Sequence, residues 1–250
     1  MSIINTFDSK SAEILTARDM IQQNSAIPET VISVFTEDFI ELLKDTMNPT
    51  VVGALFAGAQ IPIYSFQYCG KTIGFFRSSI GGAATAGLLE EIAAMGAKKV
   101  LFFGSCGSLD KEITAGHLLI PTAAYRDEGT SYHYAPPSDF IEVQTADRLS
   151  EIFDMINMPY VRTKTWTTDA IYRETHDNMA KRKSEGCSVV EMECASIMAA
   201  AQFRGIEAYQ FLYAADCLDG EQWDSRILGR MPDDVRERIF KVAIETAIRL

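Results

Sequence analysis

The chain has 250 residues, 47% of them hydrophobic, and 34 acidic side chains outnumber 23 basic ones, which gives a net charge of −11. This balance argues against nucleic acid or a membrane surface as the main partner, and no apolar run approaches the roughly 20 residues that span a bilayer. We expect a single domain over residues 1–250 in the cytoplasm, because the N-terminal sequence lacks a signal peptide's charged and apolar regions. The five cysteines have no metal-ligand spacing, so we expect free thiols and no metal site.

Apolar runs separated by amphipathic stretches predict an α/β protein. Helices are expected over residues 12–24, 37–47, 78–95 and 145–157, after Glu193, and from Pro232 onward. Strands are expected over residues 31–35, 51–56, 61–68, 72–77, 98–103, 117–125, 160–167 and 208–215, with another ending at Val190. The pair 61–68 and 72–77 is expected to form a hairpin, which suits the antiparallel edge of a mixed sheet.

Glycines surround a serine directly after the strand at 98–103, in the segment Gly104-Ser105-Cys106-Gly107. A loop of this composition can hold an anion with its backbone N–H groups and its hydroxyl. Such turns also occur for steric reasons alone, so both interpretations stay open at this point.

A polar, aromatic-rich stretch runs from Arg126 to Pro137, after the strand at 117–125. It is too elaborate for a plain connection, and loops of this kind often carry function. A contact with a neighbouring subunit is the alternative.

Two carboxylates stand at a strand-to-helix junction, in the segment Val190-Glu191-Met192-Glu193. Ligands of open α/β sheets bind at the carboxyl ends of strands, and a carboxylate there can accept two hydrogen bonds from a vicinal diol. The unbranched Met192 can lie against the apolar face of a sugar ring. The alternative is that Glu191 and Glu193 only place negative charge at a helix N-terminus, worth about 0.3–1 kcal/mol each.

A further carboxylate, Asp216, follows the apolar strand at 208–215. Burial there would raise its pKa toward the range useful for proton transfer. Arg226 and Arg230 are close enough in sequence to be its charge partners. A helix cap or a loop charge is the alternative for Asp216, and Trp223 is expected to serve packing.

These segments together resemble one family. The segments Ser79-Ile80-Gly81-Gly82, Gly104-Ser105-Cys106-Gly107-Ser108, Asp127 to Pro136, Val190-Glu191-Met192-Glu193 and Asp216 have the order and spacing seen in the nucleoside phosphorylases. That superfamily includes the hexameric purine nucleoside phosphorylases, the uridine phosphorylases and the methylthioadenosine nucleosidases. The resemblance covers roughly residues 28–250, and the stretch 126–136 looks especially like uridine phosphorylase.

The resemblance implies a three-layer α/β/α fold with a mixed central sheet, no metal or other cofactor, and phosphate as co-substrate. It also implies a homodimer or homohexamer with sites near subunit interfaces. The implied reaction is phosphorolysis, in which phosphate attacks the anomeric carbon of a ribonucleoside and yields ribose 1-phosphate and the free base.

The resemblance also implies roles for individual residues. Glu193 would bind the ribose hydroxyls and Met192 would pack beneath the ring, with Glu191 beside them. Ser105 would contact phosphate, next to Gly104, and Ile171 and Val190 would wall the base. Asp216 stands where the purine enzymes and the nucleosidases keep an aspartate that protonates the purine at N7, which helps because the purine anion is a poor leaving group.

The chain departs from the family pattern in the phosphate region and near the base. Phe102 stands where the phosphorylases usually carry an arginine, and the segment Val34 to Asp38 replaces their P-G-D-P turn and the arginine that follows. Phosphate would lose two cationic partners, and Arg77 and Arg126 are the best placed replacements. The glutamine and arginine of uridine phosphorylases are not in register, although Arg173 could do related work.

Three hypotheses follow from these patterns. The first is a nucleoside phosphorylase, with purines slightly favoured over uridine because of Asp216. The second is a hydrolytic nucleosidase on the same scaffold, motivated by the missing arginines. The third is a catalytically silent nucleoside-binding protein.

Overall fold

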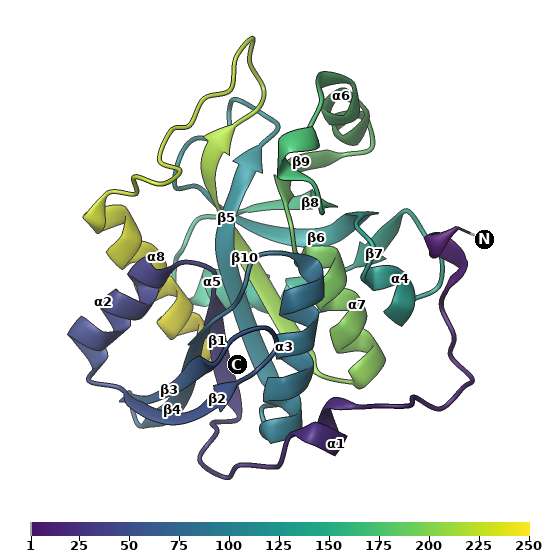
Figure 1. Cartoon of the computed structure of the whole chain (residues 1–250). Coiled ribbons are helices and arrows are strands. Elements are labelled where there is room, and N and C mark those ends of the chain that lie inside the picture. The colour runs from purple at the N-terminus through teal and green to yellow at the C-terminus, as the bar shows by residue number, and fades with distance from the viewer. Residues whose placement is uncertain (1) are drawn as a thin grey trace.

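The computed structural model describes residues 2–250 and shows a mixed β-sheet with helices on both faces (Figure 1). The strands are β1 (Thr30–Val34), β2 (Thr50–Leu55), β3 (Ile61–Tyr68), β4 (Lys71–Arg77), β5 (Lys99–Ser108), β6 (Leu118–Asp127), β7 (Phe140–Glu142), β8 (Val161–Thr168), β9 (Cys187–Glu191) and β10 (Glu207–Cys217). The α-helices are α1 (Ala17–Met20), α2 (Glu37–Met47), α3 (Gly82–Met95), α4 (Ser131–Tyr134), α5 (Ala146–Met155), α6 (His176–Ser184), α7 (Cys194–Arg204) and α8 (Asp233–Ala247). Two short 3₁₀ helices, η1 (Ile3–Asn5) and η2 (Ile171–Arg173), complete the assignment. Within residues 2–250, no helix combines the length and apolarity needed to cross a membrane.

The sheet has two parts that share β5. On one side, β1 lies parallel to both β5 and β4, and β3 and β2 continue the sheet in antiparallel pairs. On the other side, β5, β10, β6, β8 and β9 pair in a closed ring, because β5 pairs with β9 as well as with β10. The mixed sheet is confirmed, and the ring closure is a feature that the apolar pattern did not predict.

Helices cover the two faces of the sheet as separate layers (Figure 1). Helix α8 contacts α2, α5 and β1, whereas α3 and α7 pack against each other on the other side. The core lies between these layers and the sheet, where Phe103 of β5 stacks on Phe211 of β10 with 5.2 Å between ring centroids. The three-layer α/β/α arrangement expected from the sequence is therefore confirmed.

Two local predictions are wrong. Residues 12–24 form only the four-residue helix α1. Ile14 and Met20 remain 104% and 71% exposed, and Ile21, which packs against the core, follows the end of the helix. Residues 104–108, predicted to be a loop, are the last part of β5, because β10 continues alongside them.

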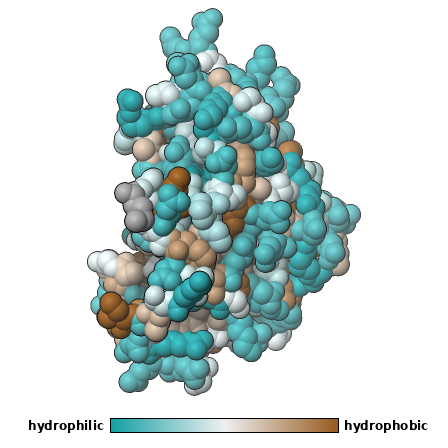
Figure 2. Space-filling model, turned by 90° about the vertical axis from the view of Figure 1, so that its right-hand side faces the viewer, coloured by the Kyte–Doolittle hydropathy of each residue, from teal (hydrophilic) through white to brown (hydrophobic). Residues whose placement is uncertain are grey.

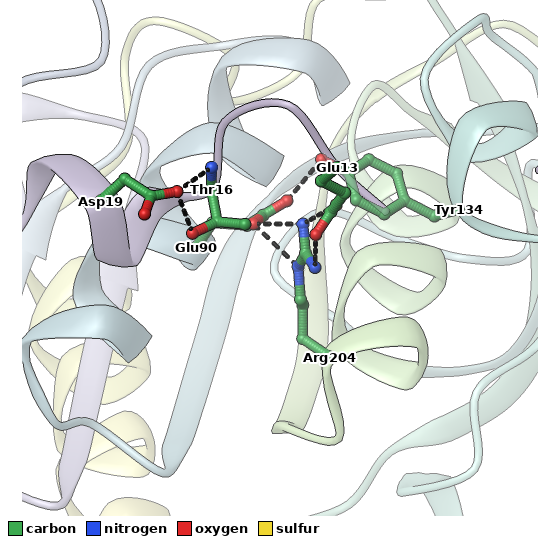
Figure 3. A network of polar contacts seen from close by, with 6 residues as sticks. All are labelled: Glu13, Thr16, Asp19, Glu90, Tyr134 and Arg204. Carbon is green, nitrogen blue, oxygen red and sulfur yellow. Dashed lines mark hydrogen bonds and ion pairs between the residues drawn. The ribbon is translucent and has the colours of Figure 1, made fainter. Parts of the chain in front are cut away.

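The N-terminal strap, residues 2–24, runs over the helices of one face and is held mainly by polar contacts (Figure 3). Arg204 of α7 donates to both carboxylate oxygens of Glu13, at 2.6 and 2.8 Å, and to Glu90 of α3 at 2.8 Å. The Tyr134 hydroxyl also donates to Glu90, at 2.6 Å. The surrounding face is mostly hydrophilic with scattered hydrophobic groups (Figure 2), and Arg204 joins three segments that are distant in sequence. Apolar contacts add to this: Phe7 packs edge-on against Phe203 of α7, and Ile21 packs against the core.

Two glycines of α3 give a matched test of its packing on α7. A β-carbon on Gly82 would lie 2.1 Å from Ser196 Oγ, whereas one on Gly87 would be 3.5 Å from the nearest atom, Ala57 Cβ. We expect Gly82→Ala to lower the free energy of unfolding by about 1–3 kcal/mol through overpacking. We expect Gly87→Ala to raise it by up to about 1 kcal/mol through helix propensity. Urea denaturation of both variants measures the difference, and equal effects would contradict the close approach of the two helices.

Candidate active site

The site lies where β5 changes partners. Strand β5 pairs with β1 up to Phe103 and with β9 from Gly107 onward, so residues 104–106 lie between the two partner strands. Ligands of α/β proteins bind at such points, where the strand connections diverge. The structure therefore brings the glycine-rich segment and the end of β9 to one edge, as the sequence predicted.

The glycine-rich segment is not the anion-binding loop that its composition suggested. Residues Gly104 to Gly107 are strand and are paired with β10. Burial raises the pKa of Tyr213, and a hydrogen bond with Ser105 opposes that rise. The ring of Phe35 lies against Gly104, since a β-carbon there would be 2.7 Å from Phe35 Cδ2. A phosphate contact by Ser105 stays a prediction.

Glu191, which we expected to bind substrate, makes four hydrogen bonds within the protein. It is 5% exposed and accepts hydrogen bonds from the hydroxyls of Thr165 (3.3 Å) and Thr167 (2.6 Å). The backbone N–H groups of Glu193 (2.8 Å) and Cys194 (2.7 Å) donate to its other oxygen. Burial raises the pKa of Glu191 and these four bonds oppose the rise. These hydrogen bonds hold β8, β9 and the start of α7 together, and substrate binding by Glu191 stays a prediction.

Glu193, in contrast, can accept further hydrogen bonds from a ligand. It is 7% exposed, and its Oε1 accepts one hydrogen bond, from the backbone N–H of Gly81 at 2.6 Å. Burial, and then the charge of Glu191, raise the pKa of Glu193 to about 8. A β-carbon on Gly82 would lie 3.6 Å from the carbonyl oxygen of Met192, so the turn before α3 packs on the same segment. The structure thus joins two predicted motifs, while ribose binding by Glu193 and Met192 stays a prediction.

Asp216 lies near the carboxyl end of β10, beside Gly107 of β5. Burial raises the pKa of Asp216, and a hydrogen bond from Trp223 is the largest effect that opposes the rise. A β-carbon on Gly107 would lie 3.3 Å from Asp216 Oδ1 and 3.0 Å from Val190 Cγ1. Asp216 and Val190 therefore approach the same small volume in front of β5.

A cavity of about 490 Å³ opens beside Asp216, a size that suits a small-molecule ligand. Its walls come from the β8–α6 connection and from the β10–α8 connection. The lining residues are Ile171, Tyr172, Glu174, Thr175, His176, Met179, Asp216, Leu218, Gly220, Glu221, Gln222, Trp223 and Leu228. Among the predicted residues, Asp216 and Ile171 line this cavity, whereas Glu193, Met192, Ser105 and Gly104 do not.

The three predicted cations have different surroundings. Arg126 is 3% exposed, and its guanidinium donates to Ser131 Oγ at 2.7 Å and to three carbonyl groups of its own loop. These contacts give Arg126 a structural role in its loop, and phosphate binding by Arg126 stays a prediction. Arg77 is half-exposed at the end of β4 and pairs with Glu37 at 3.2 Å. Arg173 is exposed on η2, and roles for it and for Arg77 stay predictions.

Two residues of the cavity were missed from the sequence. Burial, and then the charge of Asp216, raise the pKa of Glu174 to about 7; its only sequence signal is its place just after Ile171 and Tyr172. Trp223, expected to serve packing, donates its indole N–H to Asp216 Oδ2 at 2.7 Å. Arg226 donates to backbone carbonyls of Lys111 and Ile113, and its charge lowers the pKa of Asp216 as expected of a charge partner, while Trp223 makes the direct hydrogen bond.

Comparison with known proteins agrees with this geometry. The sequence model of the phosphorylase superfamily matches residues 29–249, and the chain belongs to that superfamily. It is 27% identical over 217 residues to a guanosine phosphorylase of Halorubrum lacusprofundi, covering 85% of this chain and 83% of the relative. It is also 26% identical over 151 residues to an uncharacterised protein of Acanthamoeba polyphaga mimivirus, and this match covers 58% of each chain.

Solved structures show the same fold. The purine nucleoside phosphorylase of Toxoplasma gondii in complex with immucillin-H superposes with a TM-score of 0.74 at 18% identity, covering 97% of this chain and 99% of that one. An AMP nucleosidase of Bacteroides thetaiotaomicron gives a TM-score of 0.73 at 19% identity, covering 92% and 96%. At these identities the likeness shows the fold alone.

The structural role of Glu191 can be tested by Glu191→Gln. The variant keeps the shape but presents an amide NH₂ toward buried donors, so we expect the free energy of unfolding to fall by roughly 3 kcal/mol. Glu112→Gln, a change at an exposed position, is the control and should leave stability unchanged. Urea denaturation of both proteins provides the measurement, and a stable Glu191→Gln variant would contradict the role.

Proposed function

We propose that this protein cleaves the N-glycosidic bond of a purine nucleoside with phosphate, giving ribose 1-phosphate and the free base. The observation that carries the proposal is the placement of two buried carboxyl groups, Asp216 and Glu193, beside the strand where the sheet changes partners. Membership of the phosphorylase superfamily supports the reaction class.

The two carboxyl groups suit different tasks. Burial raises the pKa of Asp216 and so favours its protonated form, from which it can give a proton to the departing purine. Glu193 can accept hydrogen bonds from the ribose hydroxyls through its remaining lone pairs once it is ionised. The purine preference rests on Asp216, because an acid at this position acts directly on the leaving group.

The proposed nucleophile is phosphate. Ser105 of β5 and Arg77, at the end of β4, are the residues that we assign to it. Two contacts favour a second candidate, hydrolysis: the Phe35 ring covers Gly104, and Glu37 already pairs with Arg77. Water needs no cationic partner, so these contacts would not hinder it.

Release of free base from a substrate panel tests the proposal. Inosine, guanosine, adenosine, uridine and methylthioadenosine would each be incubated with the purified protein, with and without phosphate. We expect release from the purine nucleosides that falls to background without phosphate. Equal release without phosphate would establish the hydrolase, and release from uridine alone would overturn the purine assignment. Binding without any release would leave only a nucleoside-binding protein.

The raised pKa of Glu193 predicts that nucleoside affinity depends on pH. The ionised carboxylate of Glu193 can accept hydrogen bonds from both ribose hydroxyls. Below about pH 8 Glu193 is mostly protonated, so it must lose its proton before the diol binds. Affinity should therefore improve with rising pH, by up to about tenfold per unit, and level off above the pKa. Calorimetric titration with a nucleoside whose base is joined through carbon, and cannot be cleaved, gives the dissociation constants.

The 2′,3′-dideoxy form of the same ligand is the control for this measurement. It lacks the hydroxyls, so its affinity should show a weaker pH dependence. The Glu193→Gln variant should remove the dependence for the diol ligand. An unchanged profile in that variant would contradict the assignment of Glu193.

A further inference from the structure

The loop after β10 holds Trp223 against Asp216. Backbone hydrogen bonds between Cys217 and Asp224, at 2.9 and 3.0 Å, close the loop at its base. Asp219, near its tip, pairs with Lys183 of α6 at 2.7 Å and accepts from the backbone N–H of Lys111 at 3.3 Å. Trp223 is 61% exposed, so burial of its ring does not explain its position. Its polar contact is the hydrogen bond to Asp216.

An indole N–H is a donor only, and this fixes where the proton of Asp216 resides. Trp223 Nε1 lies 2.7 Å from Oδ2, so Oδ2 must act as the acceptor of that bond. In a protonated carboxyl group the carbonyl oxygen is a stronger acceptor than the hydroxyl oxygen, so the bond from Trp223 favours the hydrogen on Oδ1. Oδ1 is therefore the oxygen of Asp216 from which a proton would be donated.

The selected oxygen lies beside Gly107 of β5. A β-carbon on Gly107 would lie 3.3 Å from Oδ1, 3.0 Å from Val190 Cγ1 and 2.7 Å from Leu218 Cδ1, so Oδ1 and Val190 approach the same point next to β5. The segment that we propose to bind ribose follows Val190 directly along the chain. Asp216 also lines the cavity, and Trp223 occupies its other oxygen.

A neutral donor differs from an arginine in its effect on the acid. A guanidinium paired with a carboxylate stabilises the ionised form strongly, whereas an indole orients the group without a full charge. The charged and titratable groups around Asp216 are Arg226 and Asp224 of the same loop, Glu174 across the cavity, and Cys106 of β5. Burial remains the largest effect on the pKa of Asp216 and raises it.

We propose that Trp223 is a positioning residue for catalysis, which holds Oδ2 of Asp216 so that Oδ1 carries the proton delivered to N7 of the purine. The inference rests on the proposed function. In the step, the C1′–N9 bond breaks with its electron pair going to the base, and N7 takes the proton of Oδ1. A phosphate oxygen forms the new bond to C1′, and Asp216 regains a proton from the phosphate group or solvent.

A substrate whose base leaves without being protonated distinguishes a positioning role of Trp223 from a purely structural one. The base of 7-methylguanosine already carries a positive charge on its imidazole ring and leaves as a neutral molecule without a proton from Oδ1. We would measure kcat/KM for guanosine and 7-methylguanosine with the wild-type protein and with Trp223→Phe, Asp216→Asn and Trp166→Phe. Trp166→Phe is the matched control, because Trp166 also donates to an aspartate, Asp127 at 2.9 Å, but lies outside the cavity.

We expect Trp223→Phe to lose about 10- to 100-fold on guanosine, as misplacement of a catalytic group does, with less than about threefold loss on 7-methylguanosine. Asp216→Asn should show the same selectivity with a larger loss, and Trp166→Phe should leave the ratio of the two substrates unchanged. The alkaline limb of the guanosine pH profile should move upward in Trp223→Phe, since the lost hydrogen bond had lowered the pKa of Asp216.

Equal losses on both substrates in Trp223→Phe, or no loss on either, would overturn the role of Trp223 while leaving the proposed function intact. Failure of the wild-type protein to cleave both substrates would overturn the proposed function and this inference together. The two failures are therefore distinguishable in one experiment.

Discussion

The buried carboxylate of Glu191 is the interaction on which the geometry of the site depends. Its two oxygens accept from the hydroxyls of Thr165 and Thr167 on β8 and from the first N–H groups of α7. An unpaired charge in this interior would cost several kcal/mol, and four donors remove most of that cost. Because Glu193 follows two residues later, the same interaction sets where the second carboxyl group stands.

The layers of the fold were predictable because their signals are local. Apolar runs gave the strands, and Thr36 and Pro232 marked the starts of α2 and α8. The extension of β5 beyond Gly104 was not predictable, because it depends on β10, more than a hundred residues away. The helix expected over residues 12–24 had the right spacing, but spacing alone does not supply a surface on which to bury it.

The site residues also differ in whether a local sequence signal or a contact between distant segments determines their place. Asp216, Glu193 and the turn at Gly81 were identified from motif spacing, and the structure brings the last two into contact. The structural contacts of Arg126 were not predictable, because a sequence shows a charge but not the carbonyl groups that surround it. The different surroundings of Glu191 and Glu193 were not predictable either, because two carboxylates two positions apart look alike until their hydrogen bonds are known. Trp223 had no local signal, since its contact with Asp216 depends on how one loop closes.

Strand β5 belongs to both the open sheet and the closed ring, and this affects when its edges become paired during synthesis of the chain. Beyond Gly104, one edge of this strand is covered only by β10 and the other only by β9, and both are made in the last third of the sequence. Residues 104–108 of a growing chain therefore lack both partner strands until β9 and β10 have emerged, whereas the apolar part of β5, residues 99–103, can pair with β1 on one edge. Such edges favour aggregation, so this architecture ties successful folding to completion of the polypeptide.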